Sequence, residues 1–539
     1  MATNAPAQAA PLTAGGRAAP AAAGPGGISL TPLLRLYARR RLGQLAREDA
    51  ALAQRRQLAG LVAEAAGTKF GKHHDFAAIR TVADYQKRVP LRTYGEHWDD
   101  YWKRGFPELV DVTWPGRVPY FAVSSGTTSG KVKHIPCSVA MARANQKAAL
   151  DTLSHHLGAT PDSRLLDGPF FMLGGSTDLK ELAPGVLAGD ISGIAAHRRP
   201  WWSRPFHFPP PELRFITDWE EKIAKMAPLS LERPIRGLSG APGWLLVLFE
   251  RLASLRPHTP GRVVDLYPEL ELIIHGGVSF APYKARFDAL LEGSKAKTRE
   301  VYAASEGYVA IADRGPGEGM RLVADNGMFF EFVPVEEVGR TNPTRHWVGD
   351  VEPGVDYAIA LTTCAGLWSY LIGDVVRFVD TRPPRLHIVG RTSYMLSSFG
   401  EHVTGELVET CVLAAARAHG LDVAEFAVGT QFGQGRGEWG RHAYVVEFVG
   451  GVPDTGRLQA FRDALDRELA SRNEDYDERR KVPTGLKEPV IEPMPPGGFA
   501  LWLKGRGRLG GQNKVPRVVG DQAVLQGLRA FAATQGGRH

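Results

Sequence analysis

The segment Ser124–Pro136, with the sequence SSGTTSGKVKHIP, indicates the architecture of the chain around it. Residues 115–123 alternate Gly and Pro with Val, Tyr and Phe, a pattern typical of a turn that leads into a strand. After the segment, Ser138 can cap a helix over 139–157. The sequence therefore predicts a strand, a glycine-rich loop and a helix in that order.

The glycines, hydroxyl groups and lysines of this loop suit a polyphosphate ligand, because flexible glycine lets backbone N–H groups converge on anionic oxygens. The loop is not a Walker A motif, which needs four residues between its glycines and Ser or Thr after the lysine. Here three residues separate Gly126 from Gly130, and Val132 follows Lys131. A surface loop without a ligand is the alternative interpretation.

Beyond this segment, helical patterns alternate with short apolar strands, which is typical of an α/β architecture. Amphipathic helical patterns run from Ser29 to Gly67 before the loop. After it, the predicted helices are 218–226 and 244–255, and the predicted strands are 270–274, 300–303, 328–333 and 357–362.

The pattern changes after Val379, where the turn-forming residues of Asp380–Pro384 predict a linker or hinge. The residues beyond predict a smaller α+β domain, with helices over 406–419 and 457–472 and strands over 426–428, 443–448 and 499–503. We therefore expect a disordered tail over 1–27, a large domain over 28–380, a hinge over 381–395 and a small domain over 396–539.

Length and composition agree with this division. The chain has 539 residues, well above the ~150 residues of a common domain, so at least two domains are expected. Hydrophobic residues make up 43% and charged residues 23%, which is ordinary globular usage. The net charge of +7 is spread over the chain, which argues against a nucleic-acid partner, and Arg39–Arg41 is expected on a solvated helix face.

The cysteines and the apolar runs favour a reduced setting away from membranes. Cys137, Cys364 and Cys411 are widely spaced, which argues against a disulfide framework and against a zinc ribbon. The N-terminal residues lack the basic start and apolar core of a signal peptide, and the apolar runs fall short of the ~20 residues of a membrane helix. We expect a soluble, cytoplasmic protein.

Two further motifs offer nucleotide-binding chemistry. In Val301–Ala310, Tyr302 can stack on a base, Ser305 can contact a phosphate oxygen, and Glu306 can hold Mg²⁺, which takes few carboxylates besides phosphates. In Leu361–Val379, Asp374 interrupts two apolar runs and can accept hydrogen bonds from both ribose hydroxyls. The alternatives are a core tyrosine, an idle surface glutamate and a hairpin-turn aspartate.

Other candidates lie at the ends of predicted elements. Gly276 and Gly277 follow a predicted strand and are candidate nucleotide contacts, whereas a serine hydrolase has no G-x-S-x-G elbow to support it. Arg391 lies beside the predicted hinge, and Lys514 stands on a glycine-rich segment that can swing toward another domain. The stretch GRGRLG at 505–510 is rejected as a dinucleotide site because no cap, helical period or acidic partner accompanies it.

Taken in order, these segments resemble the acyl-acid amido synthetases of the auxin-responsive family, within the acyl-adenylate-forming superfamily. The resemblance begins with TKFGKHHDF and KRVPLRTY, within Thr68–Tyr94, and continues through SSGTTSGKVKHIP, YAASEG, TTCAGLWSYLIGDVV, GRTSYML and QNKVPR. It implies an adenylate-forming fold with a large N-terminal domain, a small mobile C-terminal lid domain, and use of ATP and Mg²⁺. It also implies a reaction in which a small carboxylic acid is adenylated with release of pyrophosphate, and an amine, usually an amino acid, then displaces AMP.

The resemblance further implies roles for individual residues. Tyr302 lines the adenine, Ser305 and Glu306 serve phosphate and Mg²⁺, and Asp374 contacts the ribose. Lys514 reaches in from the small domain and, with Glu306, is a candidate catalytic residue. The implied phosphate contacts are Ser124, Ser125, Gly126, Thr127 and Thr128, with Lys133 nearby.

The sequence departs from the plant pattern at Trp368–Leu371, where Ser369 and Leu371 stand in place of arginines, so the identity of the acid is not carried over. The acid pocket is expected between 170–176, the helix near Trp244 and 275–280. We expect a monomer. Two rival functions stay open: an acyl-CoA ligase, which shares the adenylation step, and a non-catalytic nucleotide- or acyl-acid-binding protein of the same fold.

Overall fold

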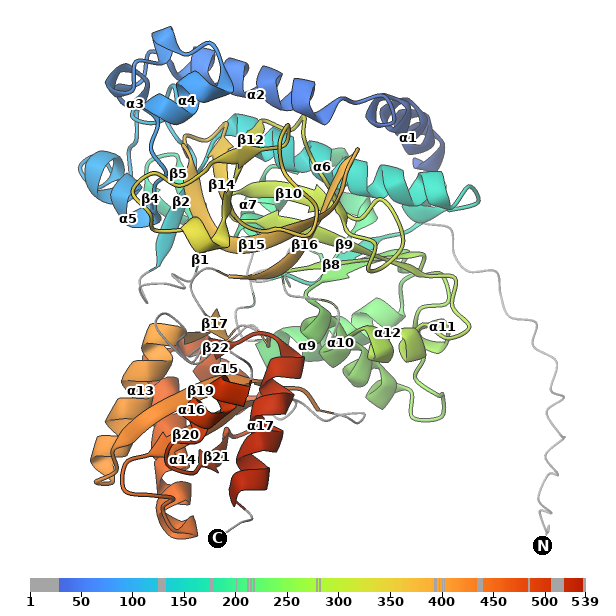
Figure 1. Cartoon of the computed structure of the whole chain (residues 1–539). Helices are drawn as coiled ribbons and strands as arrows, with labels where there is room; N and C mark the ends of the chain where they lie inside the picture. The colour runs from blue at the N-terminus through green and yellow to red at the C-terminus, as the bar shows by residue number, and fades with distance from the viewer. Residues whose placement is uncertain are drawn as a thin grey trace, which may run out of the picture.

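The chain folds into a large domain and a smaller C-terminal domain, shown as a computed structural model in Figure 1. The small domain, orange to red, lies beneath the large domain and beside its α9 and α10 helices. The structure describes residues 29–124, 132–174, 178–199, 201–210, 213, 216, 219–277, 280, 283–391, 395–396, 398–399, 401, 403–433, 440–482, 485–505 and 518–536.

The large domain is built around a mixed twelve-stranded sheet with the order β13-β12-β14-β15-β16-β11-β10-β9-β8-β7-β3-β6. Its strands, in chain order, are β3 (Phe170–Met172), β6 (His207–Phe208), β7 (Gly237–Gly240), β8 (Leu272–Gly276), β9 (Lys297–Ala304), β10 (Gly307–Ile311), β11 (Met320–Leu322), β12 (Met328–Pro334), β13 (His346–Trp347), β14 (Asp356–Thr363), β15 (Tyr370–Thr381) and β16 (Pro384–Arg391). Every residue of β12 is buried, as expected for a near-continuous apolar strand that is covered on both faces.

Strand direction divides this sheet into two parts. Neighbouring strands from β6 to β9 are parallel, and neighbouring strands from β9 to β13 are antiparallel. The carboxyl ends of the parallel strands therefore lie along one edge, which is where open α/β sheets bind ligands.

A second sheet carries the glycine-rich segment and corrects one prediction. It has the order β2-β1-β5-β4, with β1 (Tyr120–Ser124), β2 (Lys133–Cys137), β4 (Lys180–Ala183) and β5 (Val186–Gly189). The segment was predicted to run from a strand through a loop directly into a helix, but β2 intervenes. Pro136 is tolerated there because β2 is the edge strand of its sheet.

Helices pack around both sheets of the large domain, and the predicted helix after the segment is confirmed. The Ser138 side chain caps α6 by accepting a hydrogen bond from the Met141 N–H at 3.0 Å. The helices of this domain are α1 (Thr31–Leu45), α2 (Ala50–Ala65), α3 (Lys69–His73), α4 (Val82–Arg88), α5 (Tyr94–His97), α6 (Val139–Ala159), α7 (Ile191–His197), α9 (Trp219–Leu231), α10 (Pro242–Leu255), α11 (Val263–Leu266) and α12 (Lys284–Leu290).

The small domain is α+β, as predicted, around the sheet β21-β20-β19-β22. The predicted strand over 499–503 is wrong: these residues lie in α16, because Phe499 and Trp502 are one helical turn apart and are buried in the same apolar cluster. The elements are β17 (Met395–Leu396), β18 (Val403–Thr404), α13 (Gly405–Ala418), β19 (Val423–Gln431), β20 (Arg441–Phe448), α14 (Thr455–Arg472), α15 (Glu474–Lys481), β21 (Val490–Met494), α16 (Gly498–Gly505), β22 (Val518–Val519) and α17 (Gln522–Gly536).

The boundary between the cores of the two domains lies after residue 391, which is ten residues beyond the start of the predicted hinge. Residues 384–391, assigned to the hinge, form β16, which pairs with β15 through a tight turn after Thr381. Leu386 belongs to the core of the large domain, whereas Leu396 belongs to the core of the small domain. The turn formers at 380–384 thus mark a hairpin, and the connection falls in the later part of the predicted hinge.

Arg41 also differs from its predicted place on a solvated helix face. Its side chain is 7% exposed and donates to Asp151 of α6 and to Asp325, each at 2.8 Å. A helical periodicity over α1 identified the helix but did not reveal this buried ion pair, since its partners are more than 100 residues away.

Glu271 anchors the start of β8 and makes the stability of the large domain pH-dependent. It accepts from Ser163 Oγ (2.5 Å), from the Arg164 N–H (3.0 Å) and from Arg236 Nη1 (2.8 Å). Burial alone would raise the pKa of Glu271, but His156, Ser163, the Arg164 N–H and Arg236 together lower it to about 2. Because the unfolded-state pKa is about 4.3, the folded state gains stability above that pH and loses it as the pH falls toward 2.

We therefore expect the free energy of unfolding to be larger for the wild-type protein than for the Glu271→Gln variant. This difference should shrink as the pH falls from about 5 to about 2. The pH-dependent part is about 2–3 kcal/mol. Urea-unfolding midpoints of both proteins at several pH values measure it. A margin that stays constant over this range would contradict the assignment.

Across the described residues, no helix is long and apolar enough to cross a bilayer.

Candidate functional site

Glu306 lies in the tight connection between β9 and β10, at the edge of the sheet where the parallel strands have their carboxyl ends. Ala304 and Gly307 are paired, so Ser305 and Glu306 form a two-residue turn. Gly307 has φ +150°, and a Cβ there would lie 2.7 Å from the Met328 sulfur. Only glycine suits this position, and it holds Glu306 in place with 7% of its surface exposed.

Asp374 lies inside the long strand β15, not in a hairpin turn, so the hairpin-turn alternative is wrong. The pairing of β14 with β15 shifts between Ala358–Val375 and Ala360–Leu371, which leaves extra residues on β15. Gly373, with φ +94°, lies in this irregularity. Bulges of this kind re-aim a side chain, and here Asp374 is 5% exposed.

Tyr302 and Asp374 meet although three strands, β10, β11 and β16, separate β9 from β15 in the sheet order. The Tyr302 hydroxyl donates to Asp374 Oδ2 at 2.5 Å, and both side chains are buried. The contact requires the sheet to curl, so that two motifs more than 70 residues apart share one site.

Tyr370 lies against these carboxylates and Tyr94 lies beside Tyr370, so the two tyrosines form one wall of the site. Burial raises the pKa of the Tyr370 phenol well above its usual value, and the charges of Glu306 and Asp374 raise it further, with Tyr94 also close by. Tyr94 accepts a hydrogen bond from the His134 N–H at 2.9 Å, and Lys133 Nζ lies 5.6 Å from its ring centroid. Lys133, Tyr94, Tyr370 and the two carboxylates therefore form one continuous group.

The glycine-rich segment opens next to this group. Ser124 and Lys133 are the last pair of the β1–β2 hairpin, at the end where the segment 125–132 connects the two strands. The predicted phosphate contacts Ser125, Gly126, Thr127 and Thr128 lie outside the described residues, as does Lys514. The backbone of Arg391 pairs with Asp374, while its side chain also lies outside what the structure describes.

Gly276 is the last residue of β8 and pairs with Val301 of β9, and Gly277 follows the strand directly. A Cβ at Gly276 would lie 2.2 Å from the Val301 carbonyl oxygen, and Gly277 has φ +85°, so both positions require glycine. The preceding His275 is stacked on Phe280, and burial lowers its pKa to about 3. His275 is therefore neutral at physiological pH.

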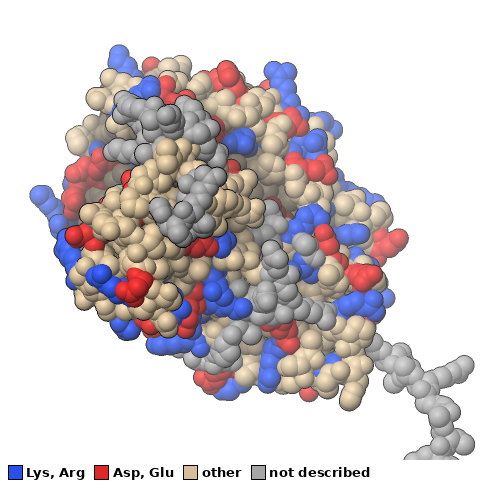
Figure 2. Space-filling view, turned by 60° about the horizontal axis from the view of Figure 1, so that its bottom comes forward, with Lys and Arg blue, Asp and Glu red and all other residues tan. Residues whose placement is uncertain are grey.

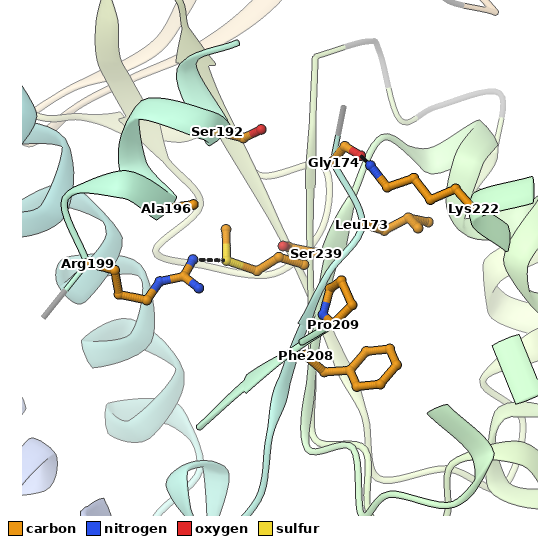
Figure 3. A pocket seen from close by; sticks show the side chains of 10 residues that line it. Leu173, Gly174, Ser192, Ala196, Arg199, Phe208, Pro209, Lys222 and Ser239 are labelled. Carbon is orange, nitrogen blue, oxygen red and sulfur yellow. Dashed lines mark hydrogen bonds between the residues drawn. The ribbon is translucent and has the colours of Figure 1, made fainter. Parts of the chain in front are cut away.

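A cavity of about 180 Å³ lies farther along the same edge, at the ends of β3 and β7 (Figure 3). Lys222 of α9 points toward Gly174 and donates to its carbonyl at 2.9 Å, and Arg199 donates to the Met172 sulfur from the opposite wall. The lining residues are Met172, Leu173, Gly174, Ser192, Ala196, Arg199, Phe208, Pro209, Lys222 and Ser239. Of the three segments predicted to form an acid pocket, 170–176 contributes Met172, Leu173 and Gly174 to this cavity, and no other described residue of the three segments lines it.

Within the described ranges, no group of three or more His, Cys, Asp or Glu side chains is arranged to hold a metal ion. Glu306 and Asp374 both lie close to Tyr370. Two neighbouring carboxylates are the kind of partial ligand set that Mg²⁺ uses when phosphates and water supply its other ligands.

Sequence reasoning missed Tyr94, Tyr370 and the cavity residues Lys222 and Arg199 as parts of a site. Tyr94 and Tyr370 stood inside quoted motifs, KRVPLRTY and TTCAGLWSYLIGDVV, so their sequence signal was present. Lys222 and Arg199 carried no such signal, because the cavity is assembled from separate elements of the large domain.

Comparison with known proteins agrees with the order of these motifs. Models of the GH3 family match the chain as an N-terminal domain at 43–174, a central domain at 321–391 and a C-terminal domain at 406–523. Together these matches cover more than half of the chain.

Individual relatives are similar at low identity. "Probable indole-3-acetic acid-amido synthetase GH3.12" of Oryza sativa subsp. japonica is 22% identical over 89% of this chain and 93% of its own length. "Indole-3-acetic acid-amido synthetase GH3.8" of Oryza sativa subsp. indica is 31% identical over 137 residues, so this chain aligns with only 23% of that relative's length. The solved "GH3.15 acyl acid amido synthetase" shares the fold, with a TM-score of 0.57 and 17% identity over 91% of this chain and 95% of its own.

Proposed function

This chain belongs to the GH3 family, and from that premise we propose that it is an ATP-dependent acyl-acid amido synthetase. It adenylates a small carboxylic acid and transfers the acyl group to an amine, for which an amino acid is the proposed acceptor. The relatives named above as amido synthetases support this activity.

The observation that carries the proposal is the convergence of Tyr302, Glu306, Tyr370 and Asp374. A buried tyrosine–aspartate pair beside a second carboxylate is poor as a packing device, since burying charge is costly. It is well suited to a ribose, whose two hydroxyls donate to a carboxylate, and to Mg²⁺, which binds carboxylate oxygens.

We assign the nucleotide as follows. Asp374, fixed by Tyr302, accepts from the ribose hydroxyls, and Glu306 holds Mg²⁺ on the phosphates. Ser124, Ser125, Gly126, Thr127 and Thr128 contact the phosphates, with Lys133, which pairs with Ser124, nearby. Gly276 and Gly277 allow close backbone approach at the end of β8. Ser305 is proposed to contact a phosphate oxygen, and Arg391 is proposed to lie near the ribose.

The acid is proposed to occupy the cavity at the ends of β3 and β7. Ser239 on β7 is two strands away from β9, which corresponds to about 10 Å at the usual strand spacing. A small acid in the cavity can therefore direct its carboxylate toward a nucleotide at Glu306. Met172, Leu173 and Phe208 supply apolar walls for its body.

The reaction proceeds in two steps. A carboxylate oxygen attacks the α-phosphorus, the bond from that phosphorus to the bridging oxygen breaks, and pyrophosphate leaves. The amine nitrogen then attacks the acyl carbon, AMP leaves, and the nitrogen loses a proton. Two anions meet in the first step, so cations must stabilise the negative charge that develops. Bound Mg²⁺ would supply part of this stabilisation, and we propose that Lys514 supplies the remainder.

Acid-dependent pyrophosphate release from ATP tests the proposal. We expect release with some members of a panel of small acids and an amide on addition of amino acids, whereas Lys514→Ala should lose release by about 10²-fold or more. A thioester formed from CoA without any amide would instead favour the acyl-CoA ligase. ATP binding without release by any acid would favour the non-catalytic alternative.

We also propose that the protein acts as a cytoplasmic monomer without nucleic-acid or membrane partners. All three cysteines are free thiols buried in the fold, which suits a reducing compartment. Figure 2 shows acidic and basic side chains interspersed over one face, the distribution expected of a surface that faces solvent.

A further inference from the structure

A buried polar cluster lies directly behind Tyr370, outside the residues assigned to ATP. We call it the Arg345 cluster, and it consists of Arg345, Glu331, Ser369, Tyr85 and Thr362. Glu331 of β12 is fully buried, and the Arg345 side chain is 10% exposed. Thr362 and Ser369 lie within the motif Leu361–Val379, whereas Arg345, Glu331 and Tyr85 belong to no motif that the sequence singled out for ATP chemistry.

All three guanidinium nitrogens of Arg345 donate hydrogen bonds within the protein. Nε and Nη2 donate to the two oxygens of Glu331 at 2.9 Å, in a bidentate pair. Nη1 donates to the carbonyls of Gln86 and Val89 at 2.8 and 2.7 Å, and Nη2 also donates to Ser369 Oγ at 2.8 Å. Such a fork fixes geometry more strictly than a lysine would.

Ser369 is held in a strained conformation by these contacts. Its φ is +44°, in the left-handed region that a non-glycine residue seldom adopts and that is strained unless the surrounding structure enforces it. Its Oγ donates to Glu331 at 2.7 Å, and its N–H donates to Thr362 Oγ1 at 2.9 Å. Tyr85 Oη lies 3.0 Å from Ser369 Oγ and 2.6 Å from Thr362 Oγ1.

The two segments held by the cluster both lead into the candidate site. Tyr370 follows Ser369 directly and faces Glu306 and Asp374. Val89 begins the segment that ends at Tyr94, and this segment is tied to β15 by the Arg92 N–H on the Ser369 carbonyl and the Leu371 N–H on the Arg92 carbonyl. The cluster thus fixes both tyrosines of the wall.

We propose that Arg345 and Glu331 are positioning residues for the nucleotide: they hold Tyr370 against the carboxylates Glu306 and Asp374, and they hold Tyr94 beside Tyr370. This rests on the proposed function only in naming ATP as the ligand. Stability alone is a weak reason for a buried ion pair, because replacing both partners by apolar residues is often neutral or stabilising. Backbone strain supported by a saturated arginine beside a ligand site is the arrangement expected of preorganisation.

The test compares Arg345→Met and the double variant Arg345→Met/Glu331→Met with Arg41→Met. Arg41 is a matched control, since it is another buried bidentate arginine, and Figure 1 shows its helix α1 on the far side of the large domain from α5. The double variant leaves no unpaired charge, so it keeps the test open where Arg345→Met alone fails to fold. ATP affinity is measured by calorimetry, independently of turnover, together with the KM for ATP.

We expect both Arg345 variants to weaken ATP binding by at least about ten-fold, which corresponds to about 1.4 kcal/mol. We expect Arg41→Met to stay within two-fold of the wild type. A folded double variant with wild-type ATP affinity would overturn the proposal, and so would an equal loss in Arg41→Met. If the wild type binds ATP but no acid releases pyrophosphate, the proposed function fails while the ATP affinities still decide the positioning role.

Discussion

Glu306→Gln is expected to lower acid-dependent pyrophosphate release by about 10²–10³-fold, the loss typical of removing one group that stabilises charge in the transition state. The substitution keeps the size of the side chain but replaces a carboxylate oxygen by an amide, a weaker ligand for Mg²⁺. Release measured against Mg²⁺ concentration should show the variant needing more Mg²⁺ to reach half-maximal rate.

Glu300→Gln is the matched control for this prediction. Glu300 lies on β9, the strand that leads into the Glu306 turn, and burial raises the pKa of its carboxyl, so it is a second partly buried carboxylate away from the turn. We expect its rate and its Mg²⁺ dependence to stay near those of the wild type. A Glu306→Gln enzyme with unchanged Mg²⁺ dependence would remove Glu306 from the proposed metal site.

Asp374→Ala is expected to raise the KM for ATP by about 100-fold or more. Two hydrogen bonds from ribose hydroxyls to a charged group are worth about 1.5–3 kcal/mol each, and 1.4 kcal/mol corresponds to ten-fold. The wild-type enzyme should discriminate strongly between ATP and its 2′-deoxy and 3′-deoxy analogues. Asp374→Ala should lose that discrimination, because the acceptor of both hydroxyls is gone.

Tyr302→Phe distinguishes the contribution of Tyr302 to ATP binding from that of Asp374. It removes one donor to Asp374 and is expected to raise the KM for ATP by about ten-fold or less. Added to Asp374→Ala, it should have little further effect, since the hydroxyl acts through the carboxylate. Retained discrimination against the deoxy analogues in Asp374→Ala would contradict the ribose assignment.

Much of the fold was predictable from local patterns. The Ser138 cap and the following helix, the buried strand β12 and the alternation of helices and strands all depend on residues that are close in sequence. The errors were also local. The segment 499–503 was assigned by its apolar run, although such a run cannot distinguish a short strand from a helix. The turn formers at 380–384 mark a hairpin, as they do in many sheets, and not the end of the domain.

The candidate site was predictable only as a set of separate motifs. Tyr302 and Asp374 were chosen for their chemistry, but nothing in either motif reveals that they are hydrogen-bonded across a curled sheet. The Arg345 cluster and the cavity at β3 and β7 draw their residues from strands and helices far apart in the chain. Arg41 shows the same effect, since its partners lie on α6 and beside β12.

The sequence by itself determined which elements form and which side chains carry nucleotide chemistry, because capping, periodicity and functional-group type are properties of short segments. Only the tertiary structure decided that Glu306, Asp374, Tyr302 and Tyr370 share one buried site. Their meeting depends on strand order, on the bulge at Gly373 and on the curl of the sheet. These features arise from contacts between distant segments, which no short pattern records.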